Sequence, residues 1–383
     1  MPRVRTLTWD QVRARRLARS HLVRPAPRER LVDVVGAVCG VQAQVMSAAE
    51  LAIGARVDGL TQADVRDELW ERRSLVKTYG PRGTLHLLPA RELAMWMAAL
   101  RAIPDYHGTL WYELSGVSRD QVEELVAATS TVLSGQQLTR EELAGAVSGK
   151  VGRWARERLA STWGDMLAPA AVTGALCFGP SRGRSVTFVR ADEWVAGWRD
   201  EDPRSAILDV LRRFLAAYGP ATPQEFARWF STKPATAQEL FTELASELVE
   251  VEVEGRRAWL LAADLDEPFD SVGTVVRLVA QYDCFVIGSR PREQLLSDAA
   301  YERIHSYRRG RFEGAVALPT LLVDGRVAGM WERRKSGRRI EITVETIDDL
   351  PPRHRKLLAA DASRVGAFLG AEATLTLGTL DDS

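Results

Sequence analysis

Two glutamines, Gln42 and Gln44, stand one residue apart at the end of an apolar stretch, "CGVQAQVM". A side-chain amide needs several hydrogen-bond partners, and burying one unpaired costs roughly 1–3 kcal/mol, so two so close together need a reason. An amide oxygen can orient a water molecule, and the negative end of its dipole can face a developing positive charge. It does not titrate near neutrality and cannot act as a strong general base. The pair is a candidate water-orienting site, with a structural cap on the preceding helix as the alternative.

Common catalytic motifs are absent from the sequence. It contains no phosphate-binding loop, no GxGxxG, no GxSxG elbow and no HExxH. The five histidines have no spacing that suggests metal ligands, and they are His21, His86, His107, His305 and His354. Three cysteines, far apart in apolar surroundings, are typical of buried free thiols in a reducing compartment. We therefore expect no metal and no cofactor.

Composition and charge describe a folded protein with no net charge. Of its 383 residues, 46% are hydrophobic and 27% charged, which suits two or three domains. No apolar run approaches the roughly 18 residues of a membrane span, and the N-terminus lacks the apolar core of a secretory signal. We expect a cytoplasmic protein that is not bound to a membrane.

The charges are unevenly placed along the chain. The first thirty residues hold nine arginines against two acids, and residues 301–340 hold ten Arg or Lys against four acids. Such segregation allows a basic face for nucleic acid on a protein of zero net charge. Solvated faces without special function are the alternative, because only five of the 51 basic residues are lysines and the arginine preference is partly a codon effect.

Hydrophobic periodicity predicts three similar segments of helices and strands. The first has helices at 9–22, 29–41, 46–57 and 62–73, the last of them capped by Thr61, then a hairpin around Gly80-Pro81-Arg82-Gly83 and a helix at 90–100. The clearest is at 204–262, where Thr222 caps a helix and strands alternate about a Glu254-Gly255 turn. Residues 118–190 permit another, with helices at 118–133, 139–149 and 164–176 and a strand at 185–190. Helices followed by a hairpin are the winged-helix pattern.

From about residue 272 the pattern is mostly β. Strands are predicted at 274–288 and over 319–346, with turns at Asp324-Gly325 and Ser336-Gly337, before a helix at 351–370 and a last strand. We predict an α+β fold: three tandem winged-helix or helix-turn-helix units packed on a C-terminal β-barrel-like sheet. The predicted boundaries are 1–115, 116–195, 196–270 and 271–383.

Three stretches resemble one protein family. "VQAQ", "RGTLHLLP" and "LVDGRVAGMW" are similar, in the same order and over nearly the whole chain, to landmarks of the AlkZ/YcaQ-type winged-helix DNA glycosylases. The family signature is glutamine, an aliphatic residue, then glutamine or aspartate. Gln42, Ala43 and Gln44 fit its Gln/Gln branch, with alanine a small choice for the middle position. The resemblance implies three winged-helix units on a β-barrel that form a concave channel for duplex DNA.

The resemblance also implies a reaction, the excision of N-alkylated purines, including bulky adducts and interstrand crosslinks left by genotoxic natural products. N7-alkylguanine and N3-alkyladenine are cationic, so the leaving group needs little protonation and the bond breaks through an oxocarbenium-like state. Gln42 and Gln44 would jointly orient the attacking water. No side chain is an obvious imine-forming lysine, which favours hydrolysis to an abasic site without strand cleavage. We predict a monofunctional DNA glycosylase that acts as a monomer on double-stranded DNA carrying alkylated purines. It would join the nucleoid on damage, and self-resistance is a role that this activity would suit.

Basic residues at two turns are candidates for DNA contact. Arg82 and His86 of the first hairpin could reach a phosphate or the adducted base, with a solvated arginine and a packed histidine as alternatives. "RRKSGRR" puts cations on both sides of a tight turn, the form expected of a hairpin that touches a groove or backbone. Its candidate residues are Arg333, Arg334, Lys335, Arg338 and Arg339.

Other singled-out residues favour structural roles. Asp283, within an apolar run, is interpreted as half of a buried ion pair rather than a catalytic acid. The tryptophans expected in the core are Trp96, Trp111, Trp154 and Trp163. A non-catalytic winged-helix regulator, or a protein that binds DNA adducts without cutting, remains the rival interpretation. A regulator would not need the glutamine pair, and no heptad repeat suited to dimerisation is present.

Overall fold

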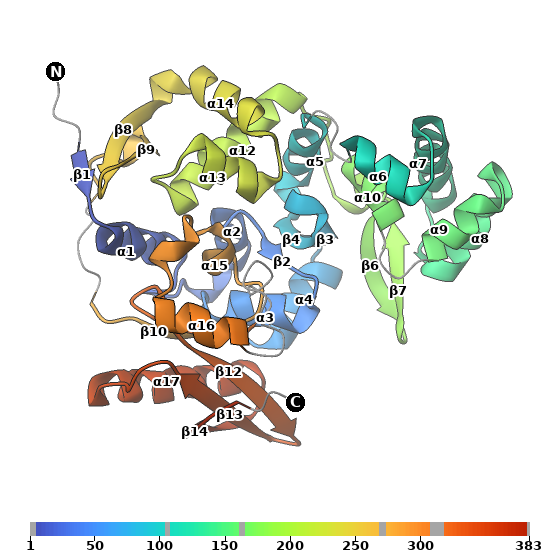
Figure 1. Cartoon of the computed structure of the whole chain (residues 1–383). Coiled ribbons are helices and arrows are strands. Elements are labelled where there is room, and N and C mark those ends of the chain that lie inside the picture. The colour runs from blue at the N-terminus through green and yellow to red at the C-terminus, as the bar shows by residue number, and fades with distance from the viewer. Residues whose placement is uncertain (1–4, 104–107, 161–164, 268–272, 307–317, 381–383) are drawn as a thin grey trace. The chain divides into compact units, whose positions relative to one another are not determined.

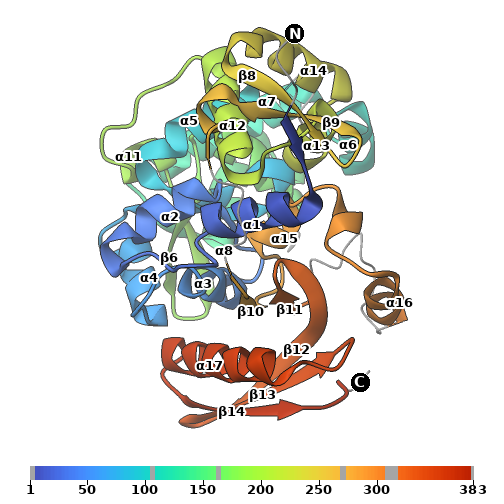
Figure 2. The same ribbon diagram turned by 90° about the vertical axis from the view of Figure 1, so that its left-hand side faces the viewer.

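The computed structural model describes residues 5–103, 108–160, 165–267, 273–306 and 318–380, and Figures 1 and 2 show it from two directions. Contacts divide the chain into two compact units. Unit 1 comprises 1–65, 212–229 and 234–383, and unit 2 comprises 66–211 with 230–233. The chain leaves unit 1 and later returns to it, so residues far apart in sequence share one core.

Among the described residues, three segments repeat one order of elements, helices followed by a hairpin. The first contains α2 (Leu31–Ala37), β2 (Val41–Gln42), α3 (Met46–Gly54), α4 (Gln62–Trp70), β3 (Leu75–Tyr79) and β4 (Leu85–Pro89). The second contains α7 (Arg119–Leu133), β5 (Leu138–Thr139), α8 (Arg140–Val151), α9 (Trp154–Ala160), β6 (Cys177–Arg182) and β7 (Ser185–Val189). The third contains α12 (Pro203–Tyr218), α13 (Pro223–Phe230), α14 (Pro234–Glu243), β8 (Leu248–Val253) and β9 (Arg256–Leu261). The order agrees with the predicted pattern, and β6 adds a hairpin partner for β7 that periodicity did not indicate.

Side chains fix where these elements begin and turn. The backbone N–H of Thr61 donates to Asp64 at 2.7 Å ahead of α4, and that of Thr222 donates to Glu225 at 2.8 Å ahead of α13. In the turn between β8 and β9, Glu254-Gly255 has φ of 45° and 80°, as a type I′ turn requires. Both caps and this turn are confirmed predictions.

The remaining helices of unit 2 connect its hairpins. They are α5 (Leu93–Arg101), α6 (Gly108–Ser115), α10 (Ala168–Val172) and α11 (Ala191–Trp194). Trp96 of α5 is completely buried, and Trp111 and Trp154 pack half-buried against the apolar core of this unit, as predicted. Trp163 lies outside the described residues. In the part of the chain that the structure describes, no helix is long and apolar enough to cross a membrane.

A five-stranded sheet forms the C-terminal part of unit 1. Its order is β10 (Val276–Val279), β11 (Thr320–Val323), β12 (Arg326–Ser336), β13 (Arg339–Thr346) and β14 (Glu372–Leu377). Neighbours are antiparallel except β13 and β14, which run parallel because α17 (Pro352–Phe368) connects them. Figure 2 shows β12 curving strongly and α17 lying along the sheet. The barrel-like sheet expected from the sequence is therefore a curled sheet, and the α+β class is confirmed.

The "LVDGRVAGMW" landmark has structural reasons for its glycines. Asp324 and Gly325 have φ of 49° and 79°, the two central residues of a type I′ turn between β11 and β12. A Cβ on Gly329 would lie 2.2 Å from the carbonyl oxygen of Glu345 on β13, so no larger residue fits there. The landmark therefore keeps β12 close to its neighbours.

The strand predicted at 274–288 is wrong over its second half. β10 ends at Val279, and α15 (Cys284–Gly288) follows. The side chain of Asp283 accepts a hydrogen bond from the backbone N–H of Phe285 at 2.9 Å and so caps α15. The same carboxylate binds Arg56 at 2.7 and 2.8 Å, and both side chains are completely buried. Asp283 thus forms the buried ion pair that the sequence favours.

The arginine-rich first helix, α1 (Trp9–Arg19), faces inward. Arg13, Arg15 and Arg16 are at most 3% exposed. Arg16 donates to three backbone carbonyls at 2.7–2.9 Å, those of Tyr218, Pro220 and Arg290. Arg15 donates to Asp264 at 2.6 Å. These arginines connect the N-terminal helix to later segments, so they do not form a basic outer face.

Candidate active site

The chain makes a tight turn immediately before the glutamine pair. At the end of α2, the backbone N–H groups of Cys39 and Gly40 donate to the carbonyls of Gly36 and Val35, both at 2.9 Å. These two bonds define a Schellman motif, whose first residue beyond the helix cap is usually glycine in the left-handed conformation. Here that residue is Cys39, with φ of 60°. A cysteine in a conformation that favours glycine therefore sets the direction in which the chain enters β2.

The two glutamines lie at different depths. Gln42 is the second residue of β2 and is 8% exposed, whereas Gln44 is exposed. Ala43 between them is 0% exposed, which accounts for the small residue at the middle of the motif. Gln44 lies two residues before the start of α3. The pair therefore runs from the interior to the surface at the head of this helix.

A buried tyrosine supports the turn. Tyr218, the last residue of α12, is 1% exposed, and its hydroxyl donates to the carbonyl of Val38 at 2.8 Å. A Cβ on Gly288 would lie 2.2 Å from the ring, so this glycine leaves room for it. Burial raises the pKa of Tyr218 well above its ordinary value, so the hydroxyl keeps its proton. Tyr218 therefore holds the backbone of the turn that precedes the glutamines. Nothing in the local sequence pattern singles it out.

The helix that follows the glutamines is held on the C-terminal sheet by α17. A Cβ on Gly54 of α3 would lie 2.5 Å from the ring of Phe368, and Arg364 donates to the carbonyl of Gly54 at 3.0 Å. Arg364 also binds Asp361 at 2.8 Å, which in turn accepts the backbone N–H of Leu278 at 2.7 Å. These contacts fix α3 relative to β10.

A cavity of about 250 Å³ opens beside the first turn of α3. Ser47, Ala48 and Leu51 of α3 line the cavity. Its other polar lining residues include Gln281, Glu332 and Arg333. The cavity brings the segment directly after Gln44 together with Arg333 of the basic hairpin. Two features that the sequence presents separately therefore meet in unit 1.

The buried carboxylate of Glu50 attracts the guanidinium group of Arg333, which lines this cavity. Burial lowers the pKa of Arg333, and the negative charge of Glu50 opposes that change. Glu50, on α3, is 0% exposed and accepts a hydrogen bond from the side-chain amide of Gln62 at 2.8 Å. No motif indicates Glu50; its sequence signal is an acid at an inward position of an otherwise apolar helix.

The basic hairpin divides its cations between two faces. Arg333 and Lys335 lie opposite Ile342 and Ile340, which are buried, and directly opposed residues share a face of the sheet. Lys335 donates to the carbonyl of Leu369, the cap residue of α17, at 2.9 Å. These two cations therefore belong to the inner face.

The other cations of the hairpin point outward or lie at its tip. Arg334 and Arg339 share the outer face and are exposed. Arg338 is exposed in the two-residue turn after Gly337, whose φ is 58°. Lys335 is exposed as well, although its ammonium group donates to Leu369, and DNA contact by any of the five candidates stays a prediction.

Within unit 2, Arg82 and His86 lie on the β3–β4 hairpin. Arg82 is half-buried at the turn with φ of 63°, and His86 is 3% exposed. Nδ1 of His86 lies 2.9 Å from the carbonyl oxygen of Thr84, which makes it the protonated ring nitrogen. Burial, and then the charge of Arg82, lowers the pKa of His86 to about 3. His86 is therefore a packed, neutral histidine, and its contact with DNA stays a prediction.

The thiols and the other potential metal ligands are dispersed. Among the described residues, no group of three or more His, Cys, Asp and Glu side chains could hold a metal ion. Cys39, Cys177 and Cys284 are all buried and unbridged. Burial raises the pKa of Cys284 to about 12 and that of Cys177 further.

The chain, with its repeated helix–hairpin segments and its curled sheet, matches a class of DNA repair enzyme. A family model described as "DNA glycosylase AlkZ-like" matches residues 35–368, and the chain belongs to this family. DNA glycosylases are hydrolases that act on N-glycosyl bonds. The family predicted from the three sequence landmarks is thereby confirmed.

Particular relatives come from Streptomyces sahachiroi. The chain is 36% identical over 332 residues to that organism's "Interstrand DNA cross-link repair glycosylase", covering 85% of this chain and 88% of the relative. The solved structure of Streptomyces sahachiroi DNA glycosylase AlkZ matches with a TM-score of 0.86 at 33% identity, over 97% of this chain and 100% of that one. The similarity thus extends over nearly the whole fold.

Proposed function

We propose that this chain hydrolyses the N-glycosidic bond of cationic N-alkylpurines in duplex DNA and leaves an abasic site. The substrates are N7-alkylguanine and N3-alkyladenine, including bulky adducts and interstrand crosslinks. Gln42 and Gln44 carry the proposal, because they lie at the head of α3, next to the segment that lines a cavity with Arg333. The name of the Streptomyces relative supports the crosslink substrates.

The reaction needs no strong acid or base from the protein. As the C1′–N9 bond breaks, the cationic purine takes the bonding electron pair, which neutralises its charge and leaves an oxocarbenium-like sugar. A water oxygen then bonds to C1′, and a proton passes to solvent. The amide oxygens of Gln42 and Gln44 accept hydrogen bonds from that water and turn the negative ends of their dipoles toward the sugar.

The exposed cations of the basic hairpin supply the DNA contact in this proposal. Arg334, Arg338 and Arg339 present positive charge along one hairpin, and such contacts to phosphate position a protein without reading sequence. Damage recognition needs such sequence-independent binding. We also propose that a single copy of the chain acts on the duplex.

The test is single-turnover release of N7-methylguanine, and then of a bulky natural-product adduct, from duplex DNA. Gln42→Ala/Gln44→Ala is expected to slow release by at least about 10²-fold, because removing one oriented polar group at a reacting centre costs roughly that much. DNA affinity should stay within about twofold of wild type, since phosphate contacts dominate it. Gln136→Ala, which removes an exposed amide in unit 2, is the matched control.

A second variant separates water orientation from base catalysis. Gln44→Glu keeps the shape of the side chain but introduces a group that titrates near about pH 4.3. We expect slower release than wild type, because Gln44 is exposed and a carboxylate in its place must give up a strongly held hydration shell when the duplex covers it. Wild-type or faster release by this variant would assign base catalysis to position 44. No release by wild type from any adduct, with tight binding to one undamaged sequence, would make the protein a regulator.

A further inference from the structure

A larger cavity in unit 1 shares no lining residue with the cavity at α3. Its volume is about 1260 Å³, and α13, α16 (Asp298–Ser306) and the loop after α15 contribute its walls. Its lining is mostly charged or polar, with Pro291 and Leu296 as aliphatic members. Small-molecule pockets hold about 300–1,000 Å³ and are lined mainly by apolar groups. The size and lining of this cavity are those of a polar groove.

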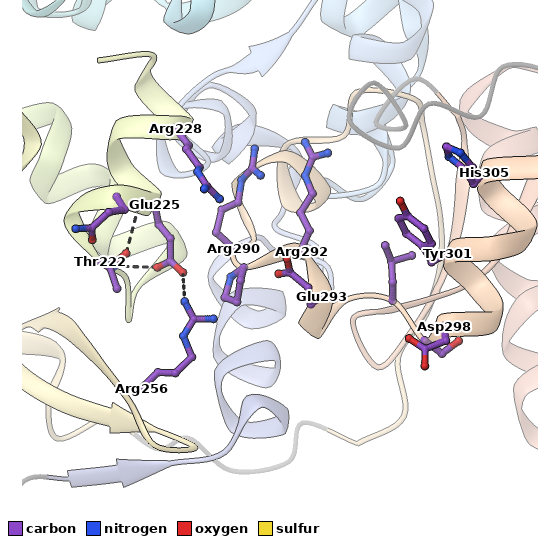
Figure 3. Close-up of a pocket in the computed structure, with 14 residues that line it drawn as sticks. Thr222, Glu225, Arg228, Arg256, Arg290, Arg292, Glu293, Asp298, Tyr301 and His305 are labelled. Atoms are coloured by element: carbon purple, nitrogen blue, oxygen red, sulfur yellow. Dashed lines mark hydrogen bonds and ion pairs between the residues drawn. The ribbon is translucent and has the colours of Figure 1, made fainter. Parts of the chain in front are cut away.

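Three arginines line one wall of the groove, and we name them the arginine row: Arg228, Arg290 and Arg292. In Figure 3 the side chains of Arg290 and Arg292 point the same way, and that of Arg228 extends from α13 toward the guanidinium group of Arg290. Arg228 is exposed on α13, because Phe226 and Trp229 of that helix are buried in the core. Arg290 and Arg292 flank Pro291. Local sequence does not join them, because folding brings α13 to this loop.

The arginine row concentrates positive charge. Burial lowers the pKa of Arg290, and the neighbouring charge of Arg228 lowers it further, while Glu225 and Glu293 oppose these effects. Nε of Arg290 is buried without a hydrogen-bond partner in the described part of the chain. Like charges held together in a groove attract anions.

Two of the three acids that line the groove, Glu225 and Asp298, face away from the arginine row. Glu225 accepts the backbone N–H of Thr222 at 2.8 Å, and Arg256 lies 3.7 Å from the same carboxylate. In Figure 3, Asp298 lies apart from the arginine row, beneath Tyr301. Glu293, the third acid, lies beside Arg292, so this wall of the groove carries three positive charges against one negative charge.

The backbone beneath the row is fixed from inside the protein. The carbonyl of Arg290 accepts a hydrogen bond at 2.8 Å from Arg16, which is 1% exposed. Arg16 also binds the carbonyls of Tyr218 and Pro220 at 2.7 and 2.9 Å. A cation whose backbone is already fixed loses little freedom when a ligand arrives, which favours binding.

Two stacked rings face solvent elsewhere along the groove. Tyr301 and His305 of α16 are exposed, and their rings are 5.7 Å apart between centroids with an interplanar angle of 5°. Cations that follow a strand's phosphates, together with flat rings that contact its sugars or bases, are the two parts of a nucleic-acid strand site.

We propose that the arginine row binds successive backbone phosphates of one DNA strand, as a contact separate from the glutamine site and the basic hairpin. The identity of the strand as substrate DNA rests on the proposed function. A free nucleotide offers the same phosphate chemistry. Three cations along a groove of about 1260 Å³ match several phosphates of a strand better than the single phosphate of a nucleotide.

The experiment measures how DNA affinity depends on salt. A labelled, undamaged duplex is titrated with wild type and with Arg228→Gln/Arg290→Gln/Arg292→Gln between roughly 50 and 200 mM salt, where each lost phosphate contact lowers the slope of log K against log salt by about 0.9. We expect the slope to fall by about 2–3 in the variant. Arg212→Gln, which removes an arginine bound to Glu247 at 2.7 and 2.8 Å, should leave the slope unchanged.

The outcomes separate this inference from the proposed function. An unchanged slope in a folded triple glutamine variant, with wild type releasing N7-methylguanine, overturns the arginine row alone. A reduced slope in the variant, with no release by wild type, supports the row and overturns the proposed function. The triple lysine variant retains the charge and should retain the slope; a loss equal to that of the glutamine variant would assign the effect to misfolding and overturn the proposal. Binding of 5′-dAMP that depends on the row, with a DNA slope that does not, would assign the site to free nucleotides.

Discussion

The arginines of α1 and those of the arginine row use the same side chain in opposite ways. Arg13, Arg15 and Arg16 are buried, and each donates to a backbone carbonyl within unit 1. Arg228 is exposed, and Arg290 is half-buried with an unsatisfied Nε at the edge of an open groove. The arginine-rich first helix therefore stabilises the fold, whereas arginines from separate segments form the charged surface. Internal acceptors, and not the local density of arginine, distinguish the two uses.

The largest expected effect is on the structural side of this comparison. Arg16→Ala removes the donor to three backbone carbonyls. Leaving a buried carbonyl without a hydrogen bond costs roughly 1–3 kcal/mol. We expect the free energy of unfolding to fall by about 3–5 kcal/mol, measured by urea denaturation followed by circular dichroism. The triple glutamine variant of the arginine row should lose less than about 1 kcal/mol, as is usual for surface substitutions. Equal losses of unfolding free energy in Arg16→Ala and in the arginine-row variant would contradict the distinction between structural and surface arginines.

The basic hairpin sharpens the comparison, because both uses of a cation occur within one element. Arg334→Ala/Arg339→Ala removes two outer-face charges, and we expect about a tenfold loss of affinity for duplex DNA at low salt with unchanged stability. Lys335→Ala removes the donor to Leu369 at the end of α17, and we expect a stability loss of about 0.5–1 kcal/mol with affinity within about twofold. Anisotropy titration and thermal unfolding of each variant give both quantities. Loss of DNA affinity in Lys335→Ala, but not in Arg334→Ala/Arg339→Ala, would reverse the assignment of the two faces.

Tyr218 tests whether an internal donor can act on the active site without touching DNA. Tyr218→Phe removes only the hydrogen bond to the carbonyl of Val38, worth about 1 kcal/mol. We expect release of N7-methylguanine to slow by about three- to tenfold in single turnover, with DNA affinity unchanged, because the turn before Gln42 loosens. Tyr112→Phe, at a half-buried tyrosine of unit 2, is the matched control. A wild-type rate would restrict Tyr218 to stability.

The smallest expected effect is that of pH on the rate. The pKa of His86 is lowered to about 3 and that of Arg16 to about 10, so between roughly pH 6 and 9 the histidine stays neutral and the arginine charged. We expect a release rate that varies by less than about twofold over this range. Stability behaves differently: the unfolded histidine binds a proton near about pH 6.5, so the contribution of neutral His86 is present above that pH and is lost as pH falls toward 3. A steep single-proton dependence of the rate near neutrality would instead indicate a titrating catalytic group.

Local signals in the sequence account for much of the fold. The caps at Thr61 and Thr222 and the turns at Glu254-Gly255 and Asp324-Gly325 depend on neighbours within a few residues, and all are confirmed. The strand predicted through Asp283 fails because apolar periodicity cannot distinguish a short buried strand from a short buried helix. At this position the carboxylate of Asp283 determines the structure, because it caps α15 and binds Arg56, which is distant in sequence.

The candidate site divides in the same way. Gln42 and Gln44 are one residue apart and could be recognised together, and the basic hairpin is one continuous run. Glu50 beside Arg333, Tyr218 beneath the turn, and the arginine row are products of tertiary packing. No periodicity or spacing encodes them, because their members come from different elements that meet only in the folded chain.

The burial of all three cysteines has a chemical consequence for a protein that works where DNA is alkylated. The thiolate is the form of cysteine that attacks electrophiles, and burial raises the pKa of Cys284 to about 12 and that of Cys177 further. Electrophiles that alkylate DNA therefore find no accessible, ionised cysteine on the protein, which should remain unmodified while its substrate accumulates. Intact mass after treatment of the native protein with iodoacetamide measures this: we expect no adduct on the folded chain and three after unfolding.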